Sequence, residues 1–211
     1  MIKCVVFDFD GTLVDSKAVF VQLYNAIAQK RGYTLMDSDN IEYLRTLSII
    51  ERCTYLKVPL YKIPLIASKI IKQYEASVPL LQFNPGITEM LSQIYEKNIP
   101  YAILSSNSTR NISRFFKLKG VEVNDIFCSS NIFGKDRVLR KFLKAKNLTP
   151  SEIIYVGDEA RDIIACRKLG IQVAWVSWGY DHVEALNHHL PDYIVNNPNE
   201  LLHLLTHLPA L

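Results

Sequence analysis

Six short runs of apolar, largely β-branched residues recur along the 211-residue chain and constrain its fold more than any other feature. They lack the clean alternation of apolar and polar residues that marks a strand with one solvent-facing side, so we expect both faces of each strand to be covered. Amphipathic segments with helical spacing lie between them. This alternation predicts a Rossmann-like, doubly wound parallel α/β sheet. The runs are 2–7, 100–104, 126–129, 153–156, 173–177 and 193–195.

The segment 15–83 interrupts the alternation of strands and helices. It holds amphipathic stretches and no convincing strand, and Ser16 can cap a helix at its start. A turn at residues 84–86 precedes the point at which the alternation resumes. We therefore predict an α/β core of residues 1–14 and 84–211 with an all-helical cap of residues 15–83 inserted after the first strand. The alternative is that these helices pack as ordinary elements of one domain.

The composition is that of an ordinary folded domain, with 49% hydrophobic residues and a formal net charge of +3. This excludes a disordered chain, and the charge is too small to favour a nucleic-acid or membrane partner. No stretch is long and apolar enough for a spanning helix, and the N-terminus does not resemble a signal peptide. We expect a cytoplasmic protein in which Cys4, Cys53, Cys128 and Cys166 are buried free thiols.

The strongest local signal is Asp8-Phe9-Asp10-Gly11-Thr12, directly after the first apolar run. Because side chains alternate along a strand, Asp8 and Asp10 emerge on the same side. Ligands of open parallel sheets bind at the carboxyl ends of the strands, and two carboxylates that point the same way repel each other unless a cation lies between them. Asp-Gly is also common in turns. The fixed spacing of four specified residues favours a cation site over a simple turn.

A second group of acids, Asp158, Glu159 and Asp162, follows the fourth apolar run and opens a helix. Asp158 and Asp162 are four residues apart, so both can face the first acid pair across the sheet edge. The helix dipole alone also favours acids at this position. Together the two groups predict a carboxylate cluster, and oxygen ligands without a nearby histidine favour Mg²⁺ over Zn²⁺.

Two weaker signals lie at other strand ends. Ser105, Ser106 and Asn107 enter a helix after the second run, where hydroxyl and amide groups can hold phosphate oxygens, although Ser and Asn are also ordinary caps. Lys135 opens the helix after the third run. The helix dipole disfavours a cation at this end, so we expect a ligand or another side chain to stabilise the lysine there. Together the four signals predict a phosphoryl ligand that is bridged to a metal and attacked by a carboxylate.

In chain order, the segments DFDGTLVDS, LSSN, GK and GDEARD resemble the four motifs of the haloacid dehalogenase superfamily. The match extends from residue 7 to residue 162. Within the superfamily the chain is similar to the phosphoglycolate phosphatase-like subgroup, which carries a helical cap after the first strand. The predicted insert at 15–83 agrees with that subgroup in position and kind.

The resemblance implies the following chemistry. Asp8 would be the nucleophile that forms an aspartyl-phosphate, and Asp10 would protonate the leaving oxygen and then activate water. Mg²⁺ would be bound by Asp8, the backbone carbonyl of Asp10, and Asp158. Ser105 and Lys135 would bind the transferring phosphoryl group, and we add the neighbours of Ser105 to that set, Ser106 and Asn107.

Three further residues would support the metal site without binding the ion directly, namely Thr12, Asp162 and Glu159. Glu159 departs from the pattern, because many relatives carry a small residue there. We expect it to face solvent or to lie behind the metal ligands, and a direct or water-mediated metal contact is the alternative.

The resemblance implies a Mg²⁺-dependent phosphatase that acts on a small phosphorylated metabolite. A phosphomutase of the same superfamily would share the core residues, and a non-catalytic phospho-binding module is a further alternative that the intact Asp10 and Lys135 disfavour. The substrate and the oligomeric state stay open. In the cap, Arg45, Arg52 and Lys57 are candidates for binding a second anionic group of the substrate, and for each of them an ordinary surface charge is the favoured alternative.

Overall fold

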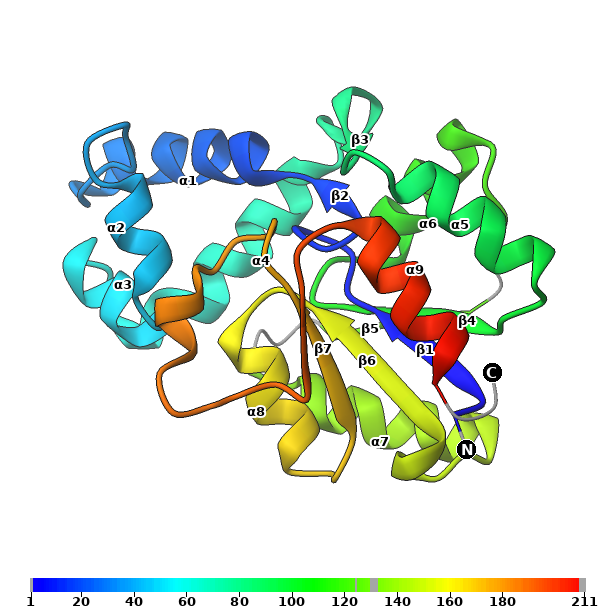
Figure 1. The fold of residues 1–211 in the computed structure, drawn as a ribbon. Coiled ribbons are helices and arrows are strands. Elements are labelled where there is room, and N and C mark those ends of the chain that lie inside the picture. The colour runs from blue at the N-terminus through cyan, green and yellow to red at the C-terminus, as the bar shows by residue number, and fades with distance from the viewer. Residues whose placement is uncertain (1, 124, 130–132, 209–211) are drawn as a thin grey trace.

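The computed structural model describes residues 2–123, 125–129 and 133–208 (Figure 1). Its centre is a parallel sheet with the strand order β5-β4-β1-β6-β7-β8. All six predicted strands are present, with ends that differ from the prediction by at most two residues. They are β1 (Cys4–Phe7), β4 (Tyr101–Ser105), β5 (Ile126–Cys128), β6 (Ile153–Gly157), β7 (Gln172–Val176) and β8 (Tyr193–Val195).

Helices cover both faces of this sheet, as the continuous apolar strands require (Figure 1). One face packs against α5 (Ile87–Glu96), α6 (Thr109–Lys119) and α9 (Pro198–His207). The other packs against α7 (Lys135–Lys146) and α8 (Ala160–Arg167). Alternate residues of β1 enter the two cores, which confirms the doubly wound α/β prediction.

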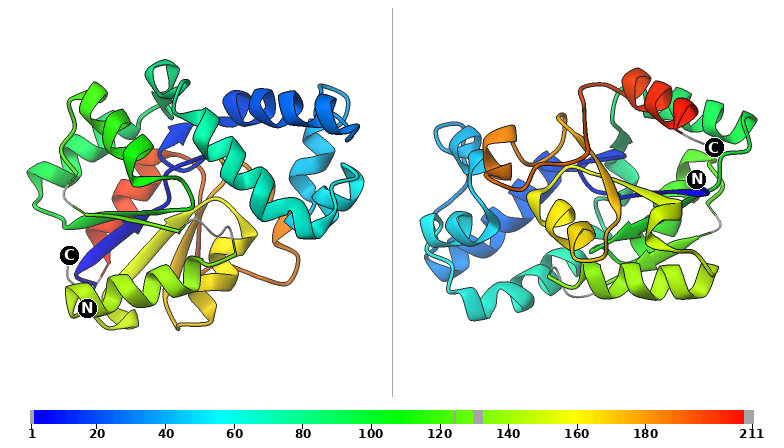
Figure 2. Two further views of the ribbon diagram at one scale, coloured as in Figure 1. Left: turned by 180° about the vertical axis from the view of Figure 1, so that it is seen from behind. Right: turned by 60° about the horizontal axis from the view of Figure 1, so that its bottom comes forward.

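A helical insert follows β1, and its helices share an apolar cluster separate from the two cores of the sheet. Its helices are α1 (Lys17–Arg31), α2 (Ile41–Thr46), α3 (Ile49–Tyr55) and α4 (Ile63–Tyr74). In both views of Figure 2 they lie beyond one end of the sheet. Within the insert, short 3₁₀ turns occur at η1 (Leu60–Lys62) and η2 (Val78–Leu80). Two more, η3 (Pro150–Glu152) and η4 (Val183–Leu186), lie in the core.

The two ends of the insert pair with each other as β2 (Val14–Asp15) and β3 (Gln82–Phe83), which run antiparallel. The sequence prediction of no strand in this region was wrong here, because two-residue strands carry no detectable alternation. The pairing brings both connections of the insert to one place beside the sheet. The division into domains at residues 15 and 83 stays a prediction.

Two smaller expectations need correction. Ser16 does precede α1, but its hydroxyl bonds to the hydroxyl of Tyr180 at 2.8 Å and not to the helix start. All four cysteines are free, yet only Cys4 and Cys166 are buried, whereas Cys53 and Cys128 are half-buried. Among the residues that the structure covers, we find no helix with the length and apolar character needed to span a bilayer.

Candidate active site

Asp8 follows β1 directly, at the carboxyl edge of the sheet, and its side chain is buried. Its neighbours Phe7 and Phe9 are packed in the core, as predicted, and therefore anchor the backbone on both sides of the acid. One oxygen of Asp8 accepts the backbone N–H of Phe9 at 2.7 Å, and the other accepts Nζ of Lys135 at 2.5 Å. The two donors hold the carboxylate in one orientation.

Lys135 opens α7, and its ammonium group forms ion pairs with Asp8 and Asp162. The residue is only 3% exposed. Burial by itself acts to lower the pKa of Lys135, but Asp162 and Asp8 raise it above its usual value, so the lysine stays charged. The two carboxylates are the groups that stabilise a cation at a helix start, where the dipole disfavours it.

Asp158 follows β6 and is fully buried. Its two oxygens accept the hydroxyl of Thr12 at 2.7 Å and the backbone N–H of Tyr180 at 2.6 Å. Gly11 has φ +78°, and a Cβ there would lie 2.4 Å from Asp158, so the loop after β1 requires glycine. Burial raises the pKa of Asp158 well above its usual range. Thr12 therefore contacts a candidate metal ligand, as the resemblance implies.

Glu159 is 9% exposed and forms an ion pair with Arg161, which excludes the solvent-facing alternative for this residue. Nε of Arg161 donates to the Glu159 carboxylate at 2.8 Å, and another nitrogen of the same guanidinium donates to Ser106 Oγ at 3.2 Å. Burial acts to raise the pKa of Glu159, but Arg161 and Lys135 lower it below its usual value. Arg161 was not among the predicted site residues, although its place two positions after Glu159 in the GDEARD motif was a signal for it.

Asp10 lies beside the helical insert, and each of its carboxylate oxygens accepts a hydrogen bond. Tyr74 donates its hydroxyl at 2.5 Å, and Asn107 donates its side-chain amide at 2.9 Å. Burial raises the pKa of Asp10 above its usual value, although these two hydrogen bonds oppose the shift. Tyr74 comes from the last turn of α4, and no motif in the sequence marked it as part of the site.

Ser105, Ser106 and Asn107 leave β4 next to these acids and are all buried. Ser105 Oγ accepts the backbone N–H of Asn107 at 3.1 Å. The carbonyl oxygen of the Asn107 side chain accepts the side-chain amide of Asn111 at 2.9 Å, which fixes the amide group that reaches Asp10. The polar residues that follow β4 in the sequence thus lie at the same edge of the sheet as Asp10.

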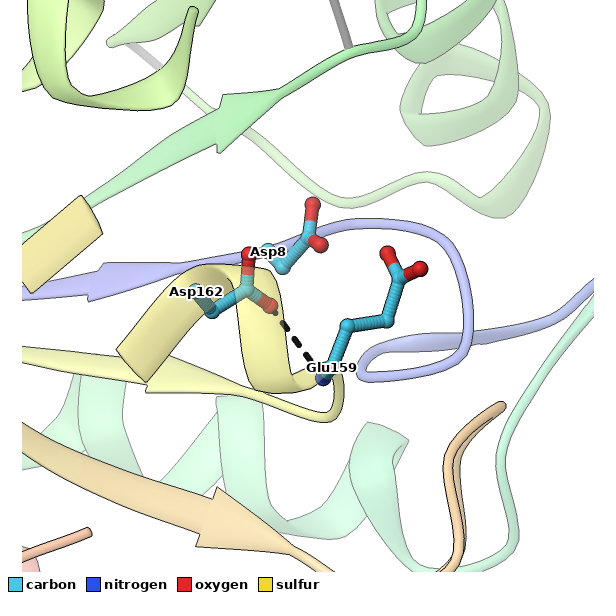
Figure 3. Close-up of side chains that lie close together, drawn as sticks. All are labelled: Asp8, Glu159 and Asp162. Atoms are coloured by element: carbon cyan, nitrogen blue, oxygen red, sulfur yellow. Dashed lines mark hydrogen bonds between the residues drawn. The ribbon is translucent and has the colours of Figure 1, made fainter. Parts of the chain in front are cut away.

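The acid that follows β1 and two of the acids that follow β6 come close enough to share a cation. Asp8, Glu159 and Asp162 each offer one carboxylate oxygen, and these atoms lie within 4.8 Å of one another (Figure 3). In Figure 3 the side chains of Asp8 and Glu159 extend toward the same space, while Asp162 turns back to the Glu159 backbone N–H at 3.4 Å.

The charges at this edge do not balance within the described ranges. Asp8 and Asp162 share Lys135, and Glu159 pairs with Arg161. For Asp158, which is buried, the same ranges contain no ion pair, and its donors are a neutral hydroxyl and a backbone N–H. A buried carboxylate without a cation is unfavourable, so the donor set fits a bound divalent ion such as Mg²⁺.

Arg45 does not contact the acid cluster. Its guanidinium donates to the backbone carbonyls of Gly179 at 3.3 Å and Tyr180 at 3.2 Å, and it pairs with Glu42 at 2.7 Å. These contacts attach α2 to the loop after β7. Lys57 is exposed, with φ +59°, and lies on the surface. The described contacts thus place these two residues away from the acid cluster, and a substrate contact by either one stays a prediction.

Arg52 connects the insert to the core through an acid. Its guanidinium pairs with Asp181 at 2.7 Å and donates to the carbonyl of Leu44 at 2.9 Å. The other oxygen of Asp181 accepts the backbone N–H of Ala160, the first residue of α8, at 2.8 Å. Arg52 does line the cavity described next, but its charge is already compensated.

A cavity of about 180 Å³ separates the insert from the edge of the sheet, and we call it the Asp10 cavity. On the core side it is lined by Asp10, Asn107 and Arg161. On the other side it is lined by α1, α3 and α4 and by the segments between α1 and α4, mostly through apolar side chains. The cavity therefore connects the polar edge at Asp10 with the apolar interior of the insert.

Known proteins share both the sequence pattern and the fold of this chain. The sequence model for haloacid dehalogenase-like hydrolases matches residues 5–176. The chain is 31% identical over 208 residues to a phosphoglycolate phosphatase of Synechococcus elongatus, with 98% of both chains covered. It is 26% identical to a glyceraldehyde 3-phosphate phosphatase of Pyrococcus furiosus, covering 97% of this chain and 93% of the relative. A solved haloacid dehalogenase-like family hydrolase from Streptococcus pneumoniae has the same fold, with a TM-score of 0.76, 22% identity, and 96% and 98% coverage.

Proposed function

Because the chain belongs to the haloacid dehalogenase-like hydrolase family, we propose that it hydrolyses phosphate monoesters through an aspartyl-phosphate on Asp8. It is a phosphoric monoester hydrolase of the phosphoglycolate phosphatase-like type, and such enzymes act on small phosphorylated metabolites. The observation that carries the proposal is the buried Asp8 carboxylate, held by Lys135 at the sheet edge next to a second acid, Asp10.

In the first step an oxygen of Asp8 attacks phosphorus, the Asp8–phosphorus bond forms, and the bond from phosphorus to the leaving oxygen breaks. Lys135 offsets the repulsion between the Asp8 carboxylate and the phosphate dianion, and its pairing with Asp162 keeps it in place. Ser105, Ser106 and Asn107 lie at the same edge and are the proposed donors to the phosphoryl oxygens.

Asp10 is the proposed acid and base. Burial raises its pKa, so it retains a proton to higher pH than an exposed carboxyl group and can donate that proton to the leaving oxygen. The resulting carboxylate then accepts a proton from the water that attacks the aspartyl-phosphate, which releases phosphate and regenerates Asp8. Tyr74 and Asn107 hold Asp10 in position through both steps.

We propose that Mg²⁺ is held by Asp8, the backbone carbonyl of Asp10, and Asp158. The uncompensated charge of buried Asp158 supports this assignment, since each oxygen retains a lone pair beyond its hydrogen bond. Glu159 and Asp162 offer carboxylate oxygens within 4.8 Å of one of Asp8, so they would add to the acidic surroundings of an ion bound beside Asp8. When bound, the metal supplies charge neutralisation between the nucleophile and the phosphate.

The test is phosphate release from a panel of phosphorylated metabolites that includes 2-phosphoglycolate and glyceraldehyde 3-phosphate, with Mg²⁺ and after its removal by a chelator. The proposal expects Mg²⁺-dependent release of inorganic phosphate. A phosphomutase would instead return an isomerised phosphorylated product, and a binding module would return the substrate unchanged. Either result would overturn the proposed hydrolysis.

A further inference from the structure

The wall of the Asp10 cavity that belongs to the helical insert is almost entirely apolar. Its side chains come from α1, from α3, from α4 and from the connecting segments. Several of them are only half-buried, because they face the cavity and not a packed neighbour. Six large apolar side chains on this wall are those of Phe20, Met36, Ile49, Leu56, Ile66 and Ile70.

The polar side chains on this wall are already bonded to other groups. Tyr24 donates its hydroxyl to the carbonyl of Thr34 at 2.9 Å, and Tyr74 donates to Asp10. Arg52 pairs with Asp181. Because Asp181 compensates the charge of Arg52 and both tyrosine hydroxyls donate elsewhere, a ligand carboxylate would meet no uncompensated cation among the described residues of this wall.

The position of Asp10 fixes which part of a substrate meets this cavity. Asp10 is the proposed donor of the proton to the leaving oxygen, and it lines the cavity, whereas Asp8 does not. The atoms attached to the leaving oxygen therefore extend from Asp10 toward α4. The cavity volume of about 180 Å³ exceeds the roughly 150 Å³ that accommodates a benzene ring in an apolar protein cavity.

We propose that the Asp10 cavity binds an apolar leaving group, so that the preferred substrate is the phosphate monoester of an alcohol with a ring or a branched alkyl body. The inference rests on the proposed function, since it assumes that Asp10 faces the leaving oxygen. It differs from the expectation that arginines of the insert bind a second anion, because the arginine on the wall is paired with Asp181.

Binding of two non-hydrolysable phosphonates by the wild-type protein tests the cavity without turnover. 2-Phenylethylphosphonate and 2-carboxyethylphosphonate differ only in an apolar ring or a carboxylate at the same position. Calorimetry in the presence of Mg²⁺ is expected to give at least about tenfold tighter binding of the phenyl compound. Equal affinities, or tighter binding of the carboxylate, would overturn the proposal.

Turnover of benzyl phosphate, 2-phosphoglycolate and ethyl phosphate separates this proposal from the proposed function. Ethyl phosphate carries only two carbon atoms on the leaving oxygen, so its turnover measures the activity of the core without the cavity. The proposal expects kcat/KM to be highest for benzyl phosphate, by about tenfold or more over 2-phosphoglycolate. A preference for 2-phosphoglycolate with normal ethyl phosphate hydrolysis would overturn the apolar subsite alone. Absence of phosphate release from all three and from the metabolite panel would overturn the proposed function, and the phosphonate affinities would still decide the subsite.

A pair of neighbouring substitutions on α4 gives a matched control. Ala67 lines the cavity, whereas Ser68 is exposed and outside it. Ala67→Leu should fill part of the cavity and lower the ratio of benzyl to ethyl phosphate kcat/KM by about tenfold, while Ser68→Leu should leave that ratio unchanged. If Ala67→Leu lowers both substrates equally and the protein still melts cooperatively, the cavity is not the leaving-group site.

Discussion

The edge of the sheet and the Asp10 cavity meet at one residue, yet they are built from opposite kinds of side chain. At the edge, buried carboxylates are paired with Lys135 and Arg161 and held by hydrogen bonds. In the cavity, most of the wall is apolar. On the proposals above, the charges at the edge bind the phosphoryl group that every substrate shares, and the cavity binds the part in which substrates differ. Chemistry and selectivity would then belong to separate parts of the chain.

Side chains of the insert also contact the core, and we call the contacts of Tyr74, Arg52 and Arg45 the junction. Tyr74 reaches Asp10, Arg52 reaches Asp181, and Arg45 reaches the backbone of the loop after β7. Each contact connects residues distant in sequence. If the two regions have separate roles, substitutions at the edge should affect all substrates alike, and substitutions at the junction should have smaller effects.

The largest effect is expected for the nucleophile. Asp8→Asn should lower kcat for every phosphate ester by at least about 10³-fold, equivalent to about 4 kcal/mol in the barrier, because the amide cannot attack phosphorus. Steady-state kinetics on ethyl and benzyl phosphate, with circular dichroism as the control for folding, provide the measurement. If the variant keeps more than about a tenth of kcat on either ester, the nucleophile is another residue.

The next effect concerns the metal ligands. Asp158→Asn and Glu159→Gln each remove one negative charge with little change in shape. We expect the dissociation constant of Mg²⁺, measured by calorimetry, to rise at least about tenfold for Asp158→Asn and by less than about threefold for Glu159→Gln. The reason is that Arg161 already neutralises Glu159, whereas the donors to Asp158 are neutral. Equal shifts would make Glu159 a ligand of the ion.

A smaller effect should follow at the junction. Tyr74→Phe removes the hydroxyl that holds Asp10 and should lower kcat about tenfold, or about 1.4 kcal/mol, for all substrates. Its matched control is Tyr24→Phe, which removes a hydroxyl from the same cavity wall that bonds only to a backbone carbonyl. Equal kcat values for the two variants would show that Tyr74 does not position Asp10.

The pair of Arg52 with Asp181 should contribute mainly to stability, in a pH-dependent way. Burial raises the pKa of Asp181 from its ordinary 3.8 to about 6, although Arg52 opposes the shift. The folded state thus binds this proton more tightly than the unfolded chain, so the Asp181 contribution to stability decreases as pH rises between about 4 and 6.

Above that window Asp181 is ionised, and there Arg52 matters most. Arg52→Gln should lower the free energy of unfolding by about 2 kcal/mol at pH 8 and by less at pH 5, where Asp181 is protonated. Denaturant unfolding at the two pH values measures this. The same loss at both would mean that the Arg52 contacts to backbone carbonyls, and not its charge pair, stabilise the junction.

The smallest effect is expected for Arg45, which lies outside the Asp10 cavity. Arg45→Gln should change KM for 2-phosphoglycolate by less than about threefold, a range typical of residues that do not contact the ligand. Kinetics on 2-phosphoglycolate and ethyl phosphate measure it. A selective rise of KM for 2-phosphoglycolate would restore Arg45 as a binding site for a second anion and weaken the separation of the two regions.

The core of the fold and much of the acidic edge are predictable from the sequence, because both follow from local patterns. The six apolar runs identify the strands, and a parallel sheet brings their carboxyl ends to one edge. This places Asp8 beside Lys135 and beside the end of β6, which Asp158 follows. The β2–β3 pair could not be predicted, since two residues have no periodicity. The sequence could not decide between an exposed and a buried Glu159, because its partner Arg161 binds it only once the chain is folded.

By itself, then, the sequence determined the order of strands and helices and the types of chemical group at the strand ends, since these depend on residues close together in the chain. The tertiary structure decided what those groups and the insert contact. Tyr74 and Asp10 are 64 residues apart, and Arg45 and Tyr180 are 135 apart. Such pairs form only when whole helices and strands pack together, so a pattern of neighbouring residues cannot predict them. For this reason the apolar character of the Asp10 cavity, and the neutralised arginine on its wall, became visible only in three dimensions.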